Sequence, residues 1–163
     1  MVNPIHALER VALCFLLTGL AACSGERAEL PVERLQERAR ELWQYKQRGD
    51  WIQVYAFLAP EYRRQTPLAE YIAGREHHVY EDASTPLLIK LVQDRAFLEV
   101  HVQWTPTHPI LATVDNAEGP LTRTLELVDE WIWAEGEWWM AQQHRLSDVR
   151  RSHPELWVED EER

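Results

Sequence analysis

An acidic side chain and a histidine are predicted to lie close together at the base of a C-terminal β-hairpin. If Glu135-Gly136 forms a two-residue turn, the flanking strands pair so that Asp129 and His144 share one face, one cross-strand diagonal apart. A carboxylate beside a histidine fixes the imidazole tautomer, so the pair could serve as a base and its orienting group. With a helical tyrosine such as Tyr55 as hydrogen-bond donor, the set would suit proton abstraction or dehydration.

The same polar pair also has a structural interpretation. Polar side chains on an otherwise apolar face often form hydrogen-bonded clusters that fix a hairpin, and His–Asp pairs are common in such networks. We favour this interpretation for Asp129 and His144. Replacing either residue should then lower the melting temperature, because its partner is left unsatisfied.

Aromatic and amphipathic side chains continue the same face toward the turn. The candidate pocket residues are Trp131, Trp133, Trp138, Met140 and Gln142. They could form the walls of a pocket for a flat ligand or a carbohydrate. They could equally be core, since cross-strand aromatic pairs stabilise a hairpin by about 0.2–1 kcal/mol each. We favour core for Trp138 and leave both interpretations open for Trp133, which is close to the turn.

The opposite face of the hairpin carries three large apolar residues, Val128, Ile132 and Trp139. This face is expected to point away from the helices, and an exposed apolar patch there would be a contact site. These residues are therefore predicted to mediate a homodimer or contact with a protein partner in the envelope.

The pair His77-His78, with three acidic residues nearby, hints at metal binding. Adjacent residues of a strand point to opposite faces, so both imidazoles cannot easily bind one ion, and we interpret the segment as solvated. The glycine-rich and histidine motifs of nucleotide enzymes and metallohydrolases are absent from the sequence. No metal and no cofactor are predicted.

The N-terminal segment has the layout of a lipoprotein export signal. The apolar run 11–22 follows Arg10 and is too short to cross a hydrocarbon layer of about 30 Å as a helix. The four residues that end this segment are Leu20, Ala21, Ala22 and Cys23. They resemble a bacterial lipobox, in which the cysteine becomes the lipidated first residue of the mature protein.

The lipobox predicts an exported protein with no free thiol. The other cysteine, Cys14, lies in the signal, so the mature chain could form no disulfide and use no cysteine for catalysis or metal binding. Acyl chains on Cys23 would attach the protein to a membrane. Ser24 after the cysteine resembles the sorting signal of Gram-negative lipoproteins, which places the protein on the periplasmic face of the outer membrane.

The net charge of the chain limits the classes of partner that are expected. The 163 residues include 27 acidic and 17 basic ones, a formal net charge of −10. Duplex nucleic acid and anionic lipid surfaces both require a basic footprint, so neither is expected as a partner. A hydrophobic content of 45% is enough to fill the core of one domain.

Hydrophobic periodicity predicts helices first and strands after them. Three helices are expected, over residues 31–49, 50–60 and 66–74. Strands are expected over residues 86–92, 96–104, 121–134 and 137–144, with a long loop before the third of them. This order is typical of an α+β fold with an antiparallel sheet.

Both ends of this region resemble NTF2-like (SnoaL-like, cystatin-like fold) domains. The stretch Arg38–Arg64 has the family's helix, then Gly-Asp, then an aromatic-rich helix ending in a Pro-x-Tyr-Arg turn. The closing hairpin has the family's Gly-x-Trp and late histidine at Gly136, Trp138 and His144. The resemblance implies a cone of three N-terminal helices packed on a strongly curved antiparallel sheet. Such cones often enclose a pocket, and many members dimerise through the sheet.

These patterns divide the chain into four parts. Residues 1–22 are predicted as signal peptide, 23–31 as lipid anchor and tether, 32–146 as an NTF2-like domain and 147–163 as an acidic tail. The family includes isomerases, dehydratases, cyclases and inactive members. We expect a non-catalytic, lipid-anchored envelope module that binds a protein partner or a small apolar ligand. The alternatives are a lyase or isomerase with a pocket acid–base pair and a structural subunit of an envelope complex.

Overall fold

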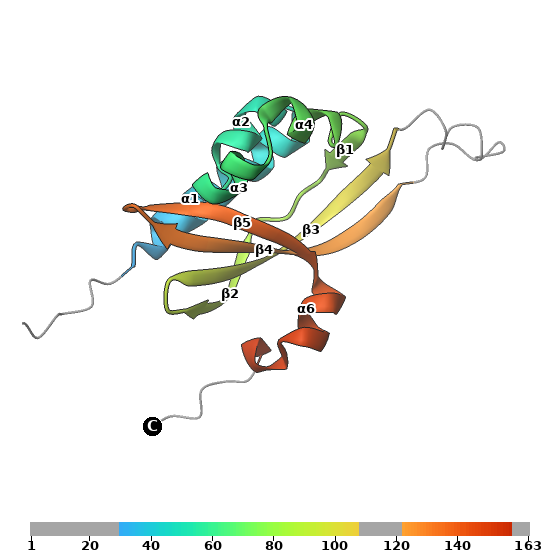
Figure 1. The fold of residues 1–163 in the computed structure, drawn as a ribbon. Helices are drawn as coiled ribbons and strands as arrows, with labels where there is room; N and C mark the ends of the chain where they lie inside the picture. Colours follow the sequence, from blue (N-terminus) through green and yellow to red (C-terminus); the bar gives the residue numbers. More distant parts are fainter. Residues whose placement is uncertain (1–29, 108–121, 158–163) are drawn as a thin grey trace, which may run out of the picture.

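The computed structural model describes residues 30–107 and 122–157. Four helices lie over one face of a five-stranded antiparallel sheet, and a C-terminal helix lies on the other face (Figure 1). The α+β class and the antiparallel sheet are as predicted, whereas the predicted strong curvature of the sheet is wrong, because the sheet is an open layer (Figure 1). The predicted signal peptide, lipobox and Cys23 fall outside the described residues. No helix within the described ranges is long and apolar enough to cross a membrane.

The first two helices follow the predicted boundary at Gly49-Asp50. Helix α1 spans Val32–Gln47 and buries one stripe of side chains, which includes Lys46. Gly49 has a φ of 66°, a left-handed conformation that glycine adopts without a steric penalty, and the chain turns there. The Asp50 carboxylate accepts a hydrogen bond from the Gln53 amide and caps helix α2, Trp51–Ala56.

The structure has one more N-terminal helix than the sequence predicts. Pro60 was expected to end a helix, but it begins helix α3, Pro60–Gln65, because the first helical turn needs no proline N–H. Helix α4 spans Leu68–Ala73. Just before α3, the Ala59 amide donates to the Met140 carbonyl and ties the helices to the last strand.

The sheet has strands β1 (His78–Glu81), β2 (Leu87–Val92), β3 (Arg95–Pro106), β4 (Arg123–Ala134) and β5 (Glu137–Arg145). The order is β1-β3-β4-β5, and β2 also pairs with β3. Strand β1 was not predicted, and it pairs with the far end of β3. The alternation predicted for β3 is confirmed, since Leu98, Val100 and Val102 are buried under the helices.

The hairpin register agrees with the prediction near the turn and departs from it further along. Trp133 pairs with Trp138 and Trp131 with Met140, as predicted. Beyond them Glu130 pairs with Gln142, so Ala141 is an additional residue on β5 and forms a β-bulge. A shift of one residue moves every later side chain of β5 to the other face.

A C-terminal helix covers the face that was expected to be free. Helix α6 spans Leu146–Ser152 and a 3₁₀-helix, η1, spans Pro154–Trp157, where the sequence pattern predicts a polar tail. Val149 and Leu156 pack with Val128 of β4 in a second, smaller core. Val128 is therefore covered by its own chain, and its predicted role in an interface is wrong.

Candidate functional site

A cavity of about 380 Å³ lies between the helices and the sheet. Its apolar and aromatic walls come from α2, α3, α4, β1 and β5, and from the turn after α2. They comprise Trp51, Leu58, Tyr62, Tyr71, Tyr80 and Met140. The polar lining includes Lys46, Arg75, Gln142 and Gln143. A concave, mostly aromatic site with a few converging polar groups is typical of a small-molecule pocket.

Lys46 is a buried cation in the wall of this cavity. The side chain is only 5% exposed, and its Nζ atom has no hydrogen-bond partner. Nζ lies 3.9 Å from Oδ1 of Asp129 and 4.2 Å from the centre of the Trp43 ring. Burial lowers the pKa of Lys46, whereas the Asp129 carboxylate raises it. A charged amine without hydrogen bonds in such a place is costly, which marks Lys46 as a functional candidate.

The Asp129 carboxylate is held by three side chains, and His144 is not one of them. It is fully buried and accepts hydrogen bonds from Trp43 Nε1 at 2.7 Å and Gln143 Nε2 at 2.5 Å. Lys46 is its third neighbour. The predicted Asp129–His144 pair is wrong because the bulge at Ala141 turns His144 to the opposite face.

Arg75 follows α4 and supplies a second positive charge to the cavity wall. Its guanidinium carbon lies 5.1 Å from the Tyr71 ring centre. Burial raises the pKa of Tyr71 to about 12 and also raises the pKa of Tyr80, although the Arg75 charge acts against both shifts. Both phenols are neutral at physiological pH, and the Tyr80 hydroxyl lies within hydrogen-bond range of His78 Nδ1.

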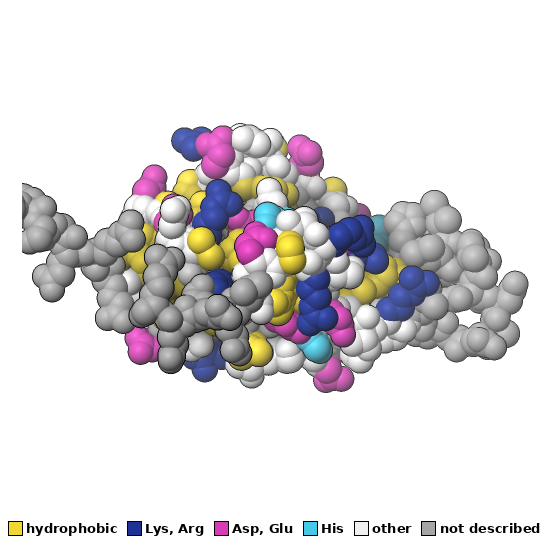
Figure 2. Space-filling view, turned by 90° about the horizontal axis from the view of Figure 1, so that it is seen from below, with side chains coloured by type: hydrophobic (Ala, Val, Ile, Leu, Met, Phe, Trp, Pro, Cys, Tyr) yellow, Lys and Arg dark blue, Asp and Glu magenta, His cyan; other side chains and the backbone are white. Residues whose placement is uncertain are grey.

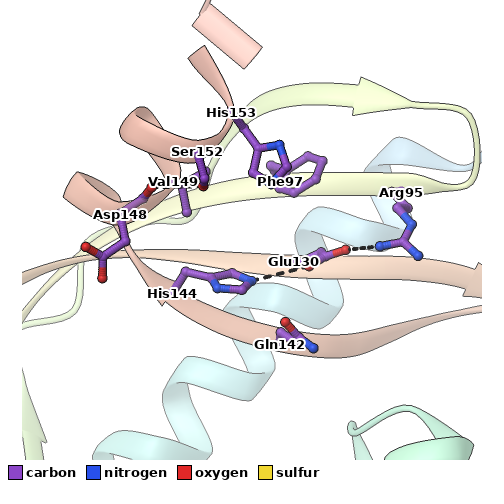
Figure 3. A pocket seen from close by; sticks show the side chains of 9 residues that line it. All are labelled: Arg95, Phe97, Glu130, Gln142, His144, Asp148, Val149, Ser152 and His153. Atoms are coloured by element: carbon purple, nitrogen blue, oxygen red, sulfur yellow. Dashed lines mark hydrogen bonds and ion pairs between the residues drawn. The ribbon is translucent and has the colours of Figure 1, made fainter. Parts of the chain in front are cut away.

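His144 lines a smaller pocket, of about 210 Å³, between the sheet and α6 (Figure 3). Its Nε2 atom lies 3.3 Å from Oε2 of Glu130, and Arg95 forms an ion pair with the same carboxylate. Asp148 and His153 line the pocket from the other side. Seen from the side of α6, positive and negative side chains are intermixed on this face (Figure 2).

The other predicted site residues divide between core and wall. Trp131 and Trp138 are fully buried in the core, which confirms the interpretation we favoured for Trp138. Trp133 is half-buried, and its ring centre lies 5.4 Å from that of Trp138. Met140 and Gln142 do line the cavity, and Gln142, beside the bulge, lines both pockets.

Two predicted residues have contacts that explain their positions. The Tyr55 hydroxyl donates to the Thr66 carbonyl at 2.8 Å, so Tyr55 ties α2 to the chain after α3 and is absent from the cavity lining. Trp139 is half-buried, with the guanidinium groups of Arg38 and Arg63 at 5.3 and 5.1 Å from its ring centre. Its surface is partly covered by its own chain, and Ile132 beside it is half-buried.

The histidines of the predicted solvated segment do not form a metal site with their neighbours. His78 begins β1, and its Nδ1 lies 3.3 Å from the Tyr80 hydroxyl. Within residues 30–107 and 122–157, no three His, Cys, Asp or Glu side chains are grouped to hold an ion.

Lys46 and Arg75 were not among the residues predicted to form a site. Lys46 lies in the helical stripe formed by Leu35, Ala39 and Leu42, so its spacing alone indicates burial. A lysine in an apolar stripe is the informative exception that periodicity can reveal. Arg75 carries no comparable signal, because it follows Gly74 in an irregular segment.

No family model and no curated protein sequence matches the chain. A protein from Exiguobacterium sibiricum, named as a Ca/calmodulin-dependent kinase II association domain, has a similar crystal structure. Its TM-score is 0.51 at 12% identity, over 74% of this chain and 95% of that one. The solution structure of a SEC-C motif containing protein from Rhodopseudomonas palustris gives 0.46 at 13% identity, over 68% and 76%. At 12% identity, the similarity to the Exiguobacterium sibiricum structure concerns the fold alone.

Proposed function

We propose that this protein is a non-catalytic, small-molecule-binding module of NTF2-like fold, attached to the cell envelope by a lipid. The observation that carries the proposal is the aromatic cavity between the helices and the sheet, with Lys46 in its wall. The likeness to the Exiguobacterium structure supports the NTF2-like assignment, together with the Gly-x-Trp hairpin of the sequence.

Binding is favoured over catalysis because the two members of the predicted acid–base pair lie on opposite faces of the sheet. Asp129 already accepts hydrogen bonds from Trp43 and Gln143, so its oxygens are engaged. His144 pairs with Glu130 on the far face. The cavity retains hydrogen-bond donors and an aromatic surface, which suit recognition.

A titration with small aromatic alcohols tests the binding function. We expect a member of the series benzyl alcohol, indole-3-ethanol and 2-naphthalenemethanol to bind the full chain carrying Cys23→Ala, measured by isothermal titration calorimetry. Ala141 also lines the cavity, so Ala141→Trp would place a large ring in its wall and should abolish that binding. Ala134→Trp, next to the hairpin turn and outside the cavity lining, should not. Failure of every alcohol and of its acid analogue to bind would contradict the proposal.

The envelope location has a separate test. Cys23→Ala should release the protein from the membrane fraction or block its maturation, because Cys23 is the predicted acylation site. Fractionation and mass spectrometry of the mature N-terminus measure both effects. Unchanged membrane retention with unchanged processing would contradict lipid attachment.

A further inference from the structure

The cavity holds an excess of positive charge in a protein that is acidic as a whole. Lys46 and Arg75 both line it, and the carboxylate in contact with Lys46 is that of Asp129. These three side chains give a formal charge of +1, whereas the whole chain has a formal charge of −10. A positive site in a negative molecule favours an anionic ligand over a neutral or cationic one.

Lys46 has hydrogen-bonding capacity that its own protein does not use. A lysine ammonium has three N–H donors, and Nζ of Lys46 has no hydrogen-bond partner although it is buried. Its nearest carboxylate oxygen, at 3.9 Å, is beyond hydrogen-bond range. That oxygen already accepts from Gln143, so the ammonium is left with donors for a ligand in the cavity.

Arg75 complements Lys46 from another element of the fold. Arg75 is half-buried, and its guanidinium lies against the Tyr71 ring, which limits its freedom. A planar guanidinium binds a carboxylate in a more specific geometry than an ammonium does. The Arg75 charge is near enough to Lys46 to contribute to lowering the pKa of that amine. A negatively charged group facing both side chains would relieve this repulsion.

We propose that the cavity binds a small organic monoanion, a carboxylate on a flat aromatic or apolar body. The carboxylate faces Lys46 and Arg75, and the body packs against Tyr62, Tyr80 and Met140. The inference rests on the proposed binding function and names its ligand class. A volume of about 380 Å³ lies toward the small end of the range for small-molecule pockets, about 300–1,000 Å³, which favours one or two rings.

Matched pairs of probes test the charge requirement separately from binding itself. Each pair has the same ring system and differs in the polar group: benzoate and benzyl alcohol, indole-3-acetate and indole-3-ethanol, 2-naphthoate and 2-naphthalenemethanol. Calorimetry on the full chain with Cys23→Ala gives the ratio of Kd for the alcohol to Kd for the acid. We expect a ratio of about tenfold or more for the pair that binds best, since charge-assisted hydrogen bonds are worth that much.

Three variants attribute this ratio to the cavity. Arg75→Gln, and the double variant Lys46→Gln with Asp129→Asn, should each reduce the ratio to about twofold or less while the alcohol still binds. The double variant keeps amide groups for Trp43 and Gln143 and avoids an unpaired buried charge, so it is expected to fold. Arg40→Gln removes a positive charge from an exposed position of α1 outside the cavity and should leave the ratio unchanged.

The outcomes are distinguishable. Equal binding of acids and alcohols to the original chain would overturn the inference and leave the proposed function standing. Absence of binding by every probe would overturn both. If the ratio of alcohol Kd to acid Kd stays high in both cavity variants, Lys46 and Arg75 do not bind the anion, and the assignment is overturned. The assignment to a monoanion is also overturned if the dianion phenyl phosphate binds more tightly than benzoate.

Discussion

Two adjacent carboxylates of β4 have opposite environments, and they define the two sides of this protein. Asp129 faces the helices and is fully buried, with buried Lys46 as its counter-charge. Glu130 faces α6 and pairs with His144 and Arg95, the latter with 58% of its side chain exposed. Glu130 is itself buried, but its partners Arg95 and His144 reach solvent, whereas Lys46 does not. Loss of the carboxylate therefore has different energetic consequences on the two faces.

The comparison also indicates why a ligand is expected on only one side. In the α6 pocket, the Glu130 carboxylate accepts hydrogen bonds from Arg95 and His144, and both of these partners are partly exposed to water. In the helix-side cavity, Lys46 keeps unpaired donors away from water. An unsatisfied buried charge favours the binding of a ligand, whereas a carboxylate already paired with two partially exposed cationic or imidazole groups does not.

The largest expected difference follows from removing one charge on each side. Asp129→Asn leaves Lys46 buried without a counter-charge, so the free energy of unfolding should fall by about 3 kcal/mol. Glu130→Gln should cost less than about 1 kcal/mol, because its partners are reached by water. Urea unfolding at pH 7 measures both values. Equal losses would contradict the contrast between the two sides.

A second prediction concerns the apolar packing of the α6 side. Leu156→Ala removes a buried side chain from the small cluster with Val128 and Val149, and should cost about 2 kcal/mol. Hydrogen exchange should show lost protection in α6, with the amides of α1 changed much less. Stability and exchange identical to the original protein would mean that residues 146–157 behave as a tail after all.

A third prediction separates His144 from catalysis and from the core. His144→Gln should lower the free energy of unfolding by less than about 1 kcal/mol, since its contact with Glu130 is only partly buried. It should also leave binding of the aromatic probes unchanged, because His144 lies on the far side of the sheet from the helix-side cavity. A weakening of acid binding as large as that expected for Arg75→Gln would mean that a change on the α6 side alters the helix-side cavity.

The smallest expected effect is a dependence of stability on alkaline pH. Burial lowers the pKa of Lys46 in the folded state, so between that value and about 10.4 the unfolded chain binds more protons than the folded one. Stability relative to the double variant Lys46→Gln with Asp129→Asn should therefore rise with pH across this window. The Asp129 charge opposes the shift and keeps the effect small. Parallel urea melts from pH 8 to 10.5 would show it, and a difference that falls with pH would contradict the sign.

Sequence periodicity predicted the strands well where one face is apolar. It failed where the strand register depends on a single bulged residue. The alternation of Leu98, Val100 and Val102 predicted β3 and its buried face correctly. The register beyond Trp131 could not be predicted, because Gln142 and Gln143 are chemically alike and either could face Asp129. Only the packed structure selects Ala141 as the bulged residue.

The C-terminal helix was missed for a different reason. Leu146 and Val149 are three residues apart, as on one face of a helix, but charged and polar neighbours made the segment resemble a solvated tail. Its burial depends on the match with Val128, a long-range contact that local patterns do not contain. Lys46, in contrast, was open to prediction from its place in the α1 stripe.

The bulge on β5 also affects how copies of this protein can associate through the edge of the sheet. Strand β5 is at the end of the sheet order, and an edge strand can pair with a strand of another chain. Here the Met140 amide and carbonyl already bond to Phe57 and Ala59, and the next residue, Ala141, interrupts the regular ladder. A regular intermolecular sheet cannot continue across this point. At Met140 and Ala141 the β5 edge is thereby protected from pairing with a strand of another copy.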